Sequence, residues 1–225
     1  MNLQLKNKVA IITGASRGIG RSIATLLAEE GMRLVLVARS QDQLEEVAGL
    51  CTVDTLVQAI DLRDPDAPAA VVEATIARFG QIDLLVNNAG ATRRGDFLTL
   101  PDKDWDDGFA LKFFGAMRLT RAAWPYLLKC QGNIVNIVGV GGRTGSEEFT
   151  IGGAVNAALL NLTKSLADRG IRDSIRVNAI NPGAVLRAPL FIVVSGLSER
   201  RMERRNRSVP TCRDMRISST TQRSN

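Results

Sequence analysis

Short apolar runs alternate with amphipathic stretches along the first 185 residues, and this alternation constrains the fold most strongly. The runs are rich in leucine and β-branched residues and lack polar alternation, which is typical of strands buried on both faces. The pattern predicts strands at 8–13, 33–38, 55–60, 82–87, 133–138 and 175–180, with helices at 18–30, 41–50, 67–79, 102–129 and about 153–169. Such an alternation predicts an α/β domain with a doubly wound parallel sheet and helices on both faces.

A glycine-rich turn directly follows the first expected strand. The segment 13–20 reads TGASRGIG and leads at once into an amphipathic helix. Glycines in this position permit a tight turn and a close approach of backbone N–H groups to phosphate. The helix start adds a favourable field for a pyrophosphate. The alternative is a strand–helix turn without a ligand, but its place after the first strand favours a Rossmann-type dinucleotide-binding fold.

The end of the second expected strand indicates which dinucleotide binds. An acidic residue there would accept hydrogen bonds from the ribose 2′-hydroxyl of NAD. The sequence instead reads VARS at 37–40, without a carboxylate. Arg39 and Arg17 can pair with a 2′-phosphate, so we expect NADP(H) to be preferred over NAD(H). The alternative is that both arginines are solvated surface residues.

Several residue types are scarce, and their scarcity excludes whole classes of function. The chain has no histidine, which excludes histidine-based catalysis and histidine metal sites. Its three cysteines, Cys51, Cys130 and Cys212, are widely separated, so we expect neither disulfides nor a metal site, as in a reducing cytoplasm. No apolar run is long enough to cross a membrane, and no signal-peptide pattern begins the chain.

The net charge of +6 is concentrated at the end of the sequence. Residues 198–225 contain eight arginines against three acidic residues, which leaves the rest of the chain nearly neutral. A nearly neutral body is not typical of nucleic-acid binding. We therefore expect no nucleic-acid and no membrane partner.

The glycine turn and the motif NNAG at 87–90 together resemble the short-chain dehydrogenase/reductase family, over about residues 5–185. Asp61 and the segment NPG at 181–183 also stand where that family has cofactor contacts. The resemblance implies that Asp61 and Leu62 contact adenine, that residues 88–90 contact the adenosine side, and that Pro182 and Gly183 contact nicotinamide. The full expected cofactor set is Gly14, Ser16, Arg17, Gly18, Ile19, Gly20, Arg39, Asp61, Leu62, Asn88, Ala89, Gly90, Pro182 and Gly183.

The same resemblance implies hydride transfer to or from a carbonyl or alcohol carbon, but the usual catalytic residues are absent. Gly139 stands at the family's serine position and Gly152 at its tyrosine position. Asn156 takes the place of the lysine, and Lys112 that of the asparagine. The single tyrosine, Tyr126, comes well before the fifth expected strand.

Lys112 is the candidate substitute for the missing acid. We expect it beneath the substrate pocket, in space opened by the two glycines and oriented by Asn156. A desolvated lysine can have a pKa suited to proton transfer. The alternative is a lysine whose stem packs while its ammonium group reaches solvent. The loop after the fifth expected strand contains Arg143, Ser146 and Glu147. These residues either line the pocket or lie on the surface of the loop.

The family's usual final helix and strand cannot be found after residue 187. We expect a dinucleotide-binding domain at 1–187 and a basic, poorly ordered tail at 188–225. The abrupt change suggests a frameshift or truncation; the alternative is a genuine basic extension that binds an acidic partner. Loss of the final strand would expose a sheet edge and weaken a homo-oligomer.

The sequence thus predicts an NADP(H)-dependent oxidoreductase of this type with an unidentified small-molecule substrate. The alternatives are a catalytically inactive NADP(H)-binding protein and a truncated or frameshifted remnant.

Overall fold

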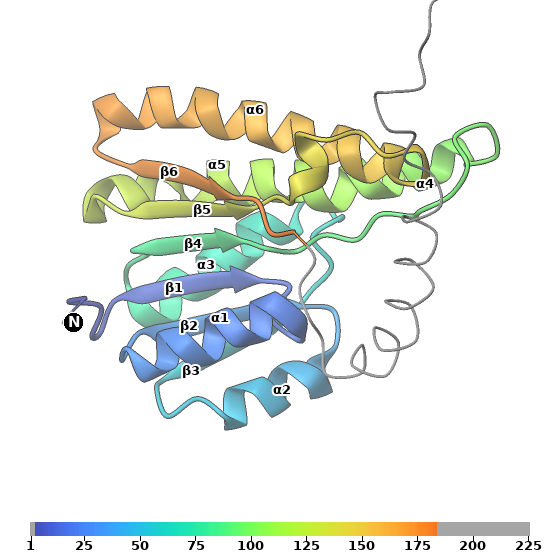
Figure 1. The fold of residues 1–225 in the computed structure, drawn as a ribbon. Helices are drawn as coiled ribbons and strands as arrows, with labels where there is room; N and C mark the ends of the chain where they lie inside the picture. The colour runs from blue at the N-terminus through green and yellow to red at the C-terminus, as the bar shows by residue number, and fades with distance from the viewer. Residues whose placement is uncertain (1–2, 184–225) are drawn as a thin grey trace, which may run out of the picture. The chain divides into compact units, whose positions relative to one another are not determined.

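The structure, a computed structural model, describes residues 3–183. Its centre is a parallel six-stranded sheet with the order β3-β2-β1-β4-β5-β6 (Figure 1). The chain moves outward from β1 to β3, returns to the middle at β4 and then moves outward again to β6. The predicted doubly wound sheet is therefore confirmed, with its switch point between β1 and β4. The strands are β1 (Val9–Thr13), β2 (Arg33–Ala38), β3 (Thr55–Ala59), β4 (Leu84–Asn87), β5 (Asn133–Ile137) and β6 (Arg176–Ile180).

Helices cover both faces of this sheet (Figure 1). They are α1 (Gly18–Glu29), α2 (Gln41–Gly49), α3 (Ala67–Phe79), α4 (Asp102–Phe109), α5 (Ala116–Cys130) and α6 (Thr150–Asp173). Alternate residues of β1 enter two separate cores: Ala10 and Ile12 pack with α1 and α2, whereas Val9 and Ile11 pack with α3 and α5. This double burial explains why the strands read as continuous apolar runs.

The prediction of one continuous α-helix at 102–129 is wrong for residues 110–115. A π-helical segment, η1 (Ala110–Gly115), separates α4 from α5 and contains Lys112. Gly115 marks the end of this segment, and a Cβ there would lie 3.0 Å from the carbonyl oxygen of Leu62. Helical periodicity does not reveal one extra residue in a turn, and such π-segments are frequent at functional sites.

The last described helix is longer than predicted at both ends. It begins at Thr150 and continues to Asp173, through Gly152, Gly153 and Gly170. Gly170 is buried, and a Cβ on it would lie 2.1 Å from the carbonyl oxygen of Ile175. Close packing against the following strand thus requires glycine inside the helix, where propensity alone predicts an end.

Several predictions concern residues outside the described range. These are the domain boundary at 187, the order of the 188–225 tail, the missing final strand and the environment of Cys212. The frameshift and truncation hypotheses concern the same segment.

Candidate functional site

The glycine turn joins β1 to α1 at the carboxyl edge of the sheet (Figure 1). Gly14 and Gly18 have φ values of +64° and +58°, in the left-handed region that favours glycine. A Cβ on Gly20 would lie 2.1 Å from the carbonyl oxygen of Gly14, so no larger residue fits without a backbone shift. Within this turn Ser16 is half-buried, while Ile19 packs against the core beneath α1.

The start of α1 carries no internal cap. Arg17 is the N-cap residue, its side chain makes no capping hydrogen bond, and the first turn contains no acidic residue. The first N–H groups of the helix therefore remain open to an anion from outside. Together with the three glycines, this arrangement fits the pyrophosphate of a dinucleotide.

Asn88 and Thr13 fasten the turn to the end of β4. The Asn88 side-chain amide donates to the carbonyl oxygens of Thr13, at 2.9 Å, and Gly14, at 3.2 Å. The Thr13 hydroxyl accepts the backbone N–H groups of Asn88 and Ala89, both at 2.9 Å, and donates to Val86. The sequence places Thr13 at the start of the glycine-rich segment but does not predict these hydrogen bonds. Its position before the first glycine of the turn was the available signal.

Replacing Thr13 by valine should destabilise the protein by about 3 kcal/mol and weaken dinucleotide binding, because two partly buried N–H groups lose their acceptor. Urea denaturation measures the first effect and calorimetric titration with NADPH the second. Thr75→Val is the matched control, since that hydroxyl is also buried but only donates to the carbonyl of Val71. Equal stability losses in the two variants would contradict the role given to Thr13.

Arg39 lies exposed at the end of β2, and neither it nor Arg17 pairs with a carboxylate of another described residue. Asp61, after β3, is half-buried. Its two carboxylate oxygens accept three hydrogen bonds from the Arg63 guanidinium. These hydrogen bonds hold the pKa of the Asp61 carboxyl below its usual range against the opposing effect of burial, with a smaller contribution from the Arg39 charge. The neighbouring Leu62 side chain is buried in the core.

Lys112 lies on η1 with its stem packed against the residues after β4. Its ammonium group donates a hydrogen bond to the carbonyl oxygen of Val138. A Cβ on Gly90 would lie 2.8 Å from the Cδ atom of Lys112, so the bare backbone at Gly90 makes room for this stem. Burial lowers the pKa of Lys112 to about 8. The expected contact with Asn156 is absent, since the hydrogen bond goes to Val138 instead.

The expected open space at the two glycines is wrong for Gly152. The ring of Phe149 fills it: a Cβ on Gly152 would lie 2.0 Å from the Cζ atom of Phe149. The same ring also packs beside Gly141. Arg94 stacks over the ring, with its guanidinium carbon 4.5 Å from the ring centroid. The space beside residue 152 is therefore filled by the ring of a phenylalanine that lies three residues earlier in the chain.

Gly139, Asn156 and Pro182 come together at the ends of β5 and β6. Gly139 has a φ of +117°, where a side chain is strained, and the Nδ2 atom of Asn156 lies 3.1 Å from its ideal Cβ position. The carbonyl oxygen of Pro182 accepts the N–H group of Val140 at 3.1 Å. An added Cβ on Gly183 would meet nothing within 4 Å. This part of the site therefore has little side-chain bulk, and its buried polar group is the side-chain amide of Asn156.

A hollow of about 600 Å³ is lined by the two sequence neighbours of Phe149, Glu148 and Thr150, and by Arg94. A backbone hydrogen bond of 3.1 Å from Gly95 to Glu148 fastens its two walls together. Arg143 and Ser146 are exposed on the neighbouring loop, and Glu147 is an exposed lining residue. The hollow is lined by Arg94, Gly95, Asp96, Phe97, Glu147, Glu148 and Thr150.

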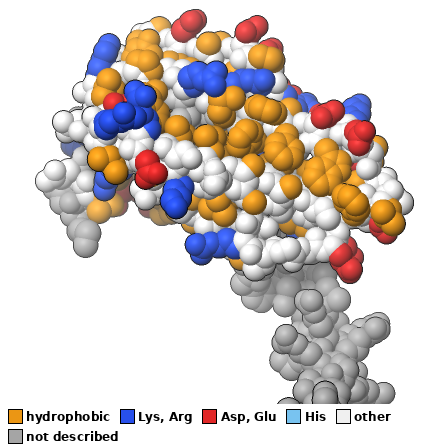
Figure 2. Space-filling model, turned by 90° about the horizontal axis from the view of Figure 1, so that it is seen from above, with side chains coloured by type: hydrophobic (Ala, Val, Ile, Leu, Met, Phe, Trp, Pro, Cys, Tyr) orange, Lys and Arg blue, Asp and Glu red, His pale blue; other side chains and the backbone are white. Residues whose placement is uncertain are grey.

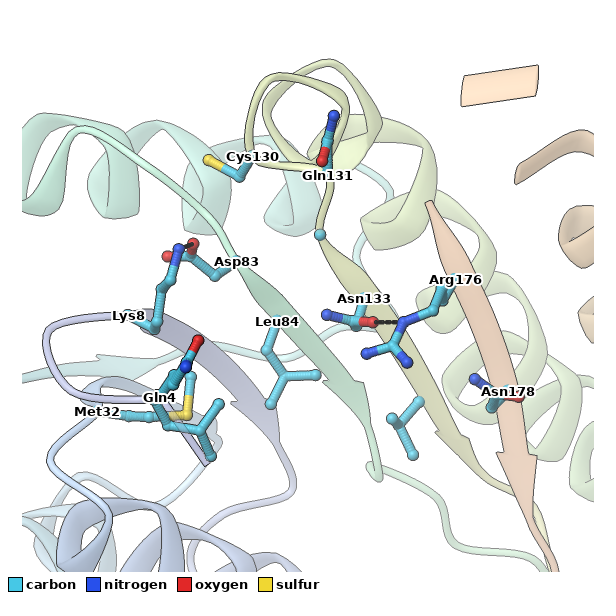
Figure 3. Close-up of a pocket in the computed structure, with 13 residues that line it drawn as sticks. Gln4, Lys8, Met32, Asp83, Leu84, Cys130, Gln131, Asn133, Arg176 and Asn178 are labelled. Carbon is cyan, nitrogen blue, oxygen red and sulfur yellow. Dashed lines mark hydrogen bonds and ion pairs between the residues drawn. The ribbon is translucent and has the colours of Figure 1, made fainter. Parts of the chain in front are cut away.

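A second cavity, of about 370 Å³, lies at the opposite edge of the sheet, where the strands begin (Figure 3). It contains the ion pair between Lys8 and Asp83 at 2.9 Å and the hydrogen bond from Arg176 to Asn133 at 2.7 Å. The buried Asp83 carboxylate also accepts the backbone N–H of Val9. These groups satisfy one another, joining β1 to the start of β4 and β5 to β6, so we interpret this cavity as structural.

Within residues 3–183, no helix combines the length and apolar character needed to cross a bilayer. In the same part of the chain, no three cysteine or acidic side chains converge in a way that could hold a metal ion.

Known proteins resemble this chain in both sequence and structure. The sequence pattern described as short chain dehydrogenase matches residues 8–192. An uncharacterized oxidoreductase of Staphylococcus epidermidis is 33% identical over 183 residues, which are 81% of this chain and 80% of that protein. A 3-oxoacyl-(acyl-carrier-protein) reductase of Vibrio cholerae is 33% identical over 184 residues, 81% of this chain and 75% of the reductase. L-sorbose reductase from Gluconobacter frateurii, solved with NADPH and L-sorbose, superposes with a TM-score of 0.82 at 35% identity, over 88% of this chain and 78% of that one.

Proposed function

Since the chain belongs to the short-chain dehydrogenase/reductase family, we propose that it is an oxidoreductase that prefers NADP(H) and acts on a small carbonyl or alcohol substrate. The family binds NAD(P)(H). The observation that carries the preference is the pair Arg17 and Arg39 at the open dinucleotide edge, without a carboxylate at the end of β2. Guanidinium groups pair well with phosphate oxygens. The NADPH in the structure of L-sorbose reductase is consistent with this preference.

Each part of the dinucleotide would contact a different group of described residues. We assign the pyrophosphate to the N–H groups of the glycine turn and the 2′-phosphate to the two arginines. We assign the adenine to Asp61 and Leu62 and the adenosine side to residues 88–90. The nicotinamide would contact Pro182 and Gly183. When bound, NADPH supplies a hydride. Lys112 would hold the proton that a substrate oxygen needs, because burial brings its pKa to about 8.

A catalytically inactive NADP(H)-binding protein is the second candidate. Gly139 and Gly152 carry no hydroxyl groups, and the ring of Phe149 fills the space at Gly152. Loss of a positioned proton donor typically costs about 10²–10⁴-fold in rate. Oxidation of NADPH in the presence of a set of carbonyl compounds would support the oxidoreductase. Binding of NADPH without oxidation would support the inactive NADP(H)-binding protein.

Replacing Arg39 by alanine should weaken NADPH binding by about tenfold or more and leave NADH binding unchanged, because only NADPH carries the 2′-phosphate. Calorimetric titration with both nucleotides measures the two affinities. Arg143→Ala is the matched control, since that arginine is exposed on the loop after β5. An equal loss of affinity for both nucleotides would contradict the assignment of Arg39.

We also propose that the protein forms a homo-oligomer, as members of the family commonly do. The face seen in Figure 2, which carries α6, gathers many hydrophobic side chains. A groove of about 450 Å³ lies between α5 and α6 on the described domain. Its apolar lining includes Trp124, Leu162 and Leu166, which a second copy would cover.

A further inference from the structure

We propose that the hollow beside Arg94 binds the hydroxyl-bearing carbon chain of an uncharged, polyhydroxylated ketone, such as a ketose, or of the alcohol formed from it. This inference rests on the oxidoreductase function proposed above and names the substrate class of that site. Each hydroxyl group of such a molecule both donates and accepts hydrogen bonds, so a matching site needs donors and acceptors side by side.

The hollow adjoins the substrate half of the site. Its volume of about 600 Å³ is lined by the loop that follows β4 and by the segment that leads into α6. These two walls are joined by the 3.1 Å hydrogen bond from the N–H group of Gly95 to the carbonyl oxygen of Glu148. Arg94 lines the hollow and also stacks over the ring of Phe149, which fills the space at Gly152. A volume of this size is typical of small-molecule sites, so a chain of about five carbon atoms fits.

The hydrogen-bond donors of this lining come mainly from Arg94. A guanidinium group carries several N–H donors and no acceptor. The guanidinium carbon of Arg94 is held 4.5 Å from the centroid of the Phe149 ring. Within residues 3–183 the group forms no ion pair and no hydrogen bond, so its N–H groups are available to a ligand. Thr150, which is half-buried on the same wall, adds a hydroxyl whose Oγ1 atom has no hydrogen-bond partner.

The acceptors of the lining are three carboxylates, those of Asp96, Glu147 and Glu148. Glu147 and Glu148 are exposed, and neither side chain pairs with another residue in the described part of the chain. One oxygen of Asp96 accepts the backbone N–H of Leu98 at 2.8 Å, which leaves its second oxygen for a ligand. The hollow therefore offers unused acceptors beside unused donors.

The ring of Phe97 gives the same hollow an apolar wall. Phe97 is 60% exposed, and an edge-to-face contact with Trp105, with 6.3 Å between the ring centroids, holds the ring in place. An exposed ring can pack against the C–H groups of a carbon chain while the hydroxyl groups of that chain meet polar side chains.

The charge of the lining distinguishes between substrate classes. Three carboxylates and one guanidinium give the hollow a formal charge of −2. This charge opposes the entry of a substrate that carries a carboxylate or a phosphate. A plain hydrocarbon chain would leave the donors and acceptors unpaired, and a cation would use the carboxylates only. A neutral polyhydroxylated chain pairs with both kinds of group and with the ring.

The first test compares ketones of five carbon atoms as ligands of the NADP⁺ complex, in which no hydride is available for turnover. The probes are D-xylulose, L-xylulose and D-ribulose, with 2-pentanone as the chain without hydroxyl groups and levulinate as the anionic ketone. Titrations followed by ligand-observed NMR measure the affinities. We expect at least one pentulose to bind about tenfold or more tightly than 2-pentanone and levulinate, because only the pentuloses pair with the polar lining. Equal or tighter binding of 2-pentanone or levulinate, or binding of none of these compounds, would overturn the proposal. Failure of NADP⁺ itself to bind would instead contradict the proposed function.

The second test compares Arg94→Met with Arg93→Met. Methionine keeps an alkyl stem beside Phe149 but has no N–H donor. Arg93 is the matched control, since it is also exposed but pairs with Asp104 at 3.6 Å and does not line the hollow. We expect Arg94→Met to bind the preferred pentulose about tenfold or more weakly and Arg93→Met to bind it normally, with NADP⁺ affinity unchanged in both. Unchanged pentulose binding in Arg94→Met, or an equal loss of NADP⁺ binding, would overturn the assignment.

The third test has a readout that a merely structural role would not affect. The double variant Glu147→Gln/Glu148→Gln removes both negative charges but keeps an acceptor oxygen on each side chain. We expect its affinity for levulinate to rise by about threefold or more at low salt, and this gain to disappear at high salt. Glu29→Gln/Glu30→Gln is the matched control, an exposed acidic pair at the end of α1 that does not line the hollow. Unchanged levulinate binding in the first variant, or an equal gain in the control, would contradict selection by the charge of the hollow.

Discussion

Replacing Gly20 by alanine should abolish dinucleotide binding, with an affinity loss of about 100-fold or more and an accompanying loss of stability. The added Cβ would lie 2.1 Å from the carbonyl oxygen of Gly14 and 2.6 Å from the amide nitrogen of Asn88. The first contact is with backbone, so the turn itself must open. The N–H groups proposed to bind the pyrophosphate would then lose their alignment. Calorimetric titration with NADPH measures the effect.

The matched control for this change is Gly49→Ala at the end of α2. A Cβ there meets nothing within 4 Å, and the position is helical. This variant should bind NADPH as the unmodified protein does and should be slightly more stable, since alanine favours the helix. Retention of NADPH affinity in Gly20→Ala would contradict the account of the turn.

Replacing Lys112 by methionine should abolish carbonyl reduction and, below pH 8, stabilise the fold by up to about 3 kcal/mol. The pKa of Lys112 is lowered from 10.5 to about 8 by burial. Below pH 8 the lysine is charged in both the folded and the unfolded chain, and the full cost of burying the charge is present. Between pH 8 and 10.5 the folded protein loses the proton first. The stability of the unmodified protein therefore rises with pH in that window.

Urea denaturation of both proteins from pH 7 to pH 10.5 measures this difference. The stabilities should converge as the pH approaches 10.5, because the lysine is then neutral in the folded protein and half deprotonated in the unfolded chain. Lys164→Met, an exposed change on α6, is the control and should show no such convergence. A pH-independent difference between the Lys112→Met variant and the unmodified protein would contradict burial as its cause. Unchanged turnover in Lys112→Met would remove the lysine from the mechanism.

The sheet could be predicted because its central strands β1, β2 and β4 are buried on both faces and read as apolar runs. Val9–Thr13 supplies residues to two cores in alternation, so neither face of β1 is polar. The glycine turn was predictable for a related reason. Its three required glycines are local in sequence, and the geometry that requires them is local too.

The parts of the site that could not be predicted depend on residues far apart in the chain. Asn88 fastens a turn more than seventy residues earlier through Thr13 and Gly14. The π-helical segment at Lys112 changes the phase of a helix whose sequence pattern looks continuous. Phe149 fills the space at Gly152 because the start of α6 and the preceding short helical turn fold its ring inward. A linear pattern does not contain these contacts.

The sequence and the structure are informative about different halves of the site. Glycine spacing and the two arginines predict the dinucleotide half, where the structure adds the hydrogen bonds that hold the turn. For the substrate half, the sequence predicts which groups are missing and offers Lys112 as a substitute acid. The structure adds the buried Asn156 amide, the ring of Phe149 and the hollow beside Arg94.

The most direct test of the central claim is a calorimetric titration of the nucleotide-free protein with NADPH and, separately, with NADH. We expect saturable binding of one nucleotide per chain, with NADPH bound at least tenfold more tightly because, in the proposed assignment, Arg17 and Arg39 pair with its 2′-phosphate. Binding of neither nucleotide by the folded protein would contradict the proposed function. Tighter binding of NADH than of NADPH would contradict the proposed cofactor preference.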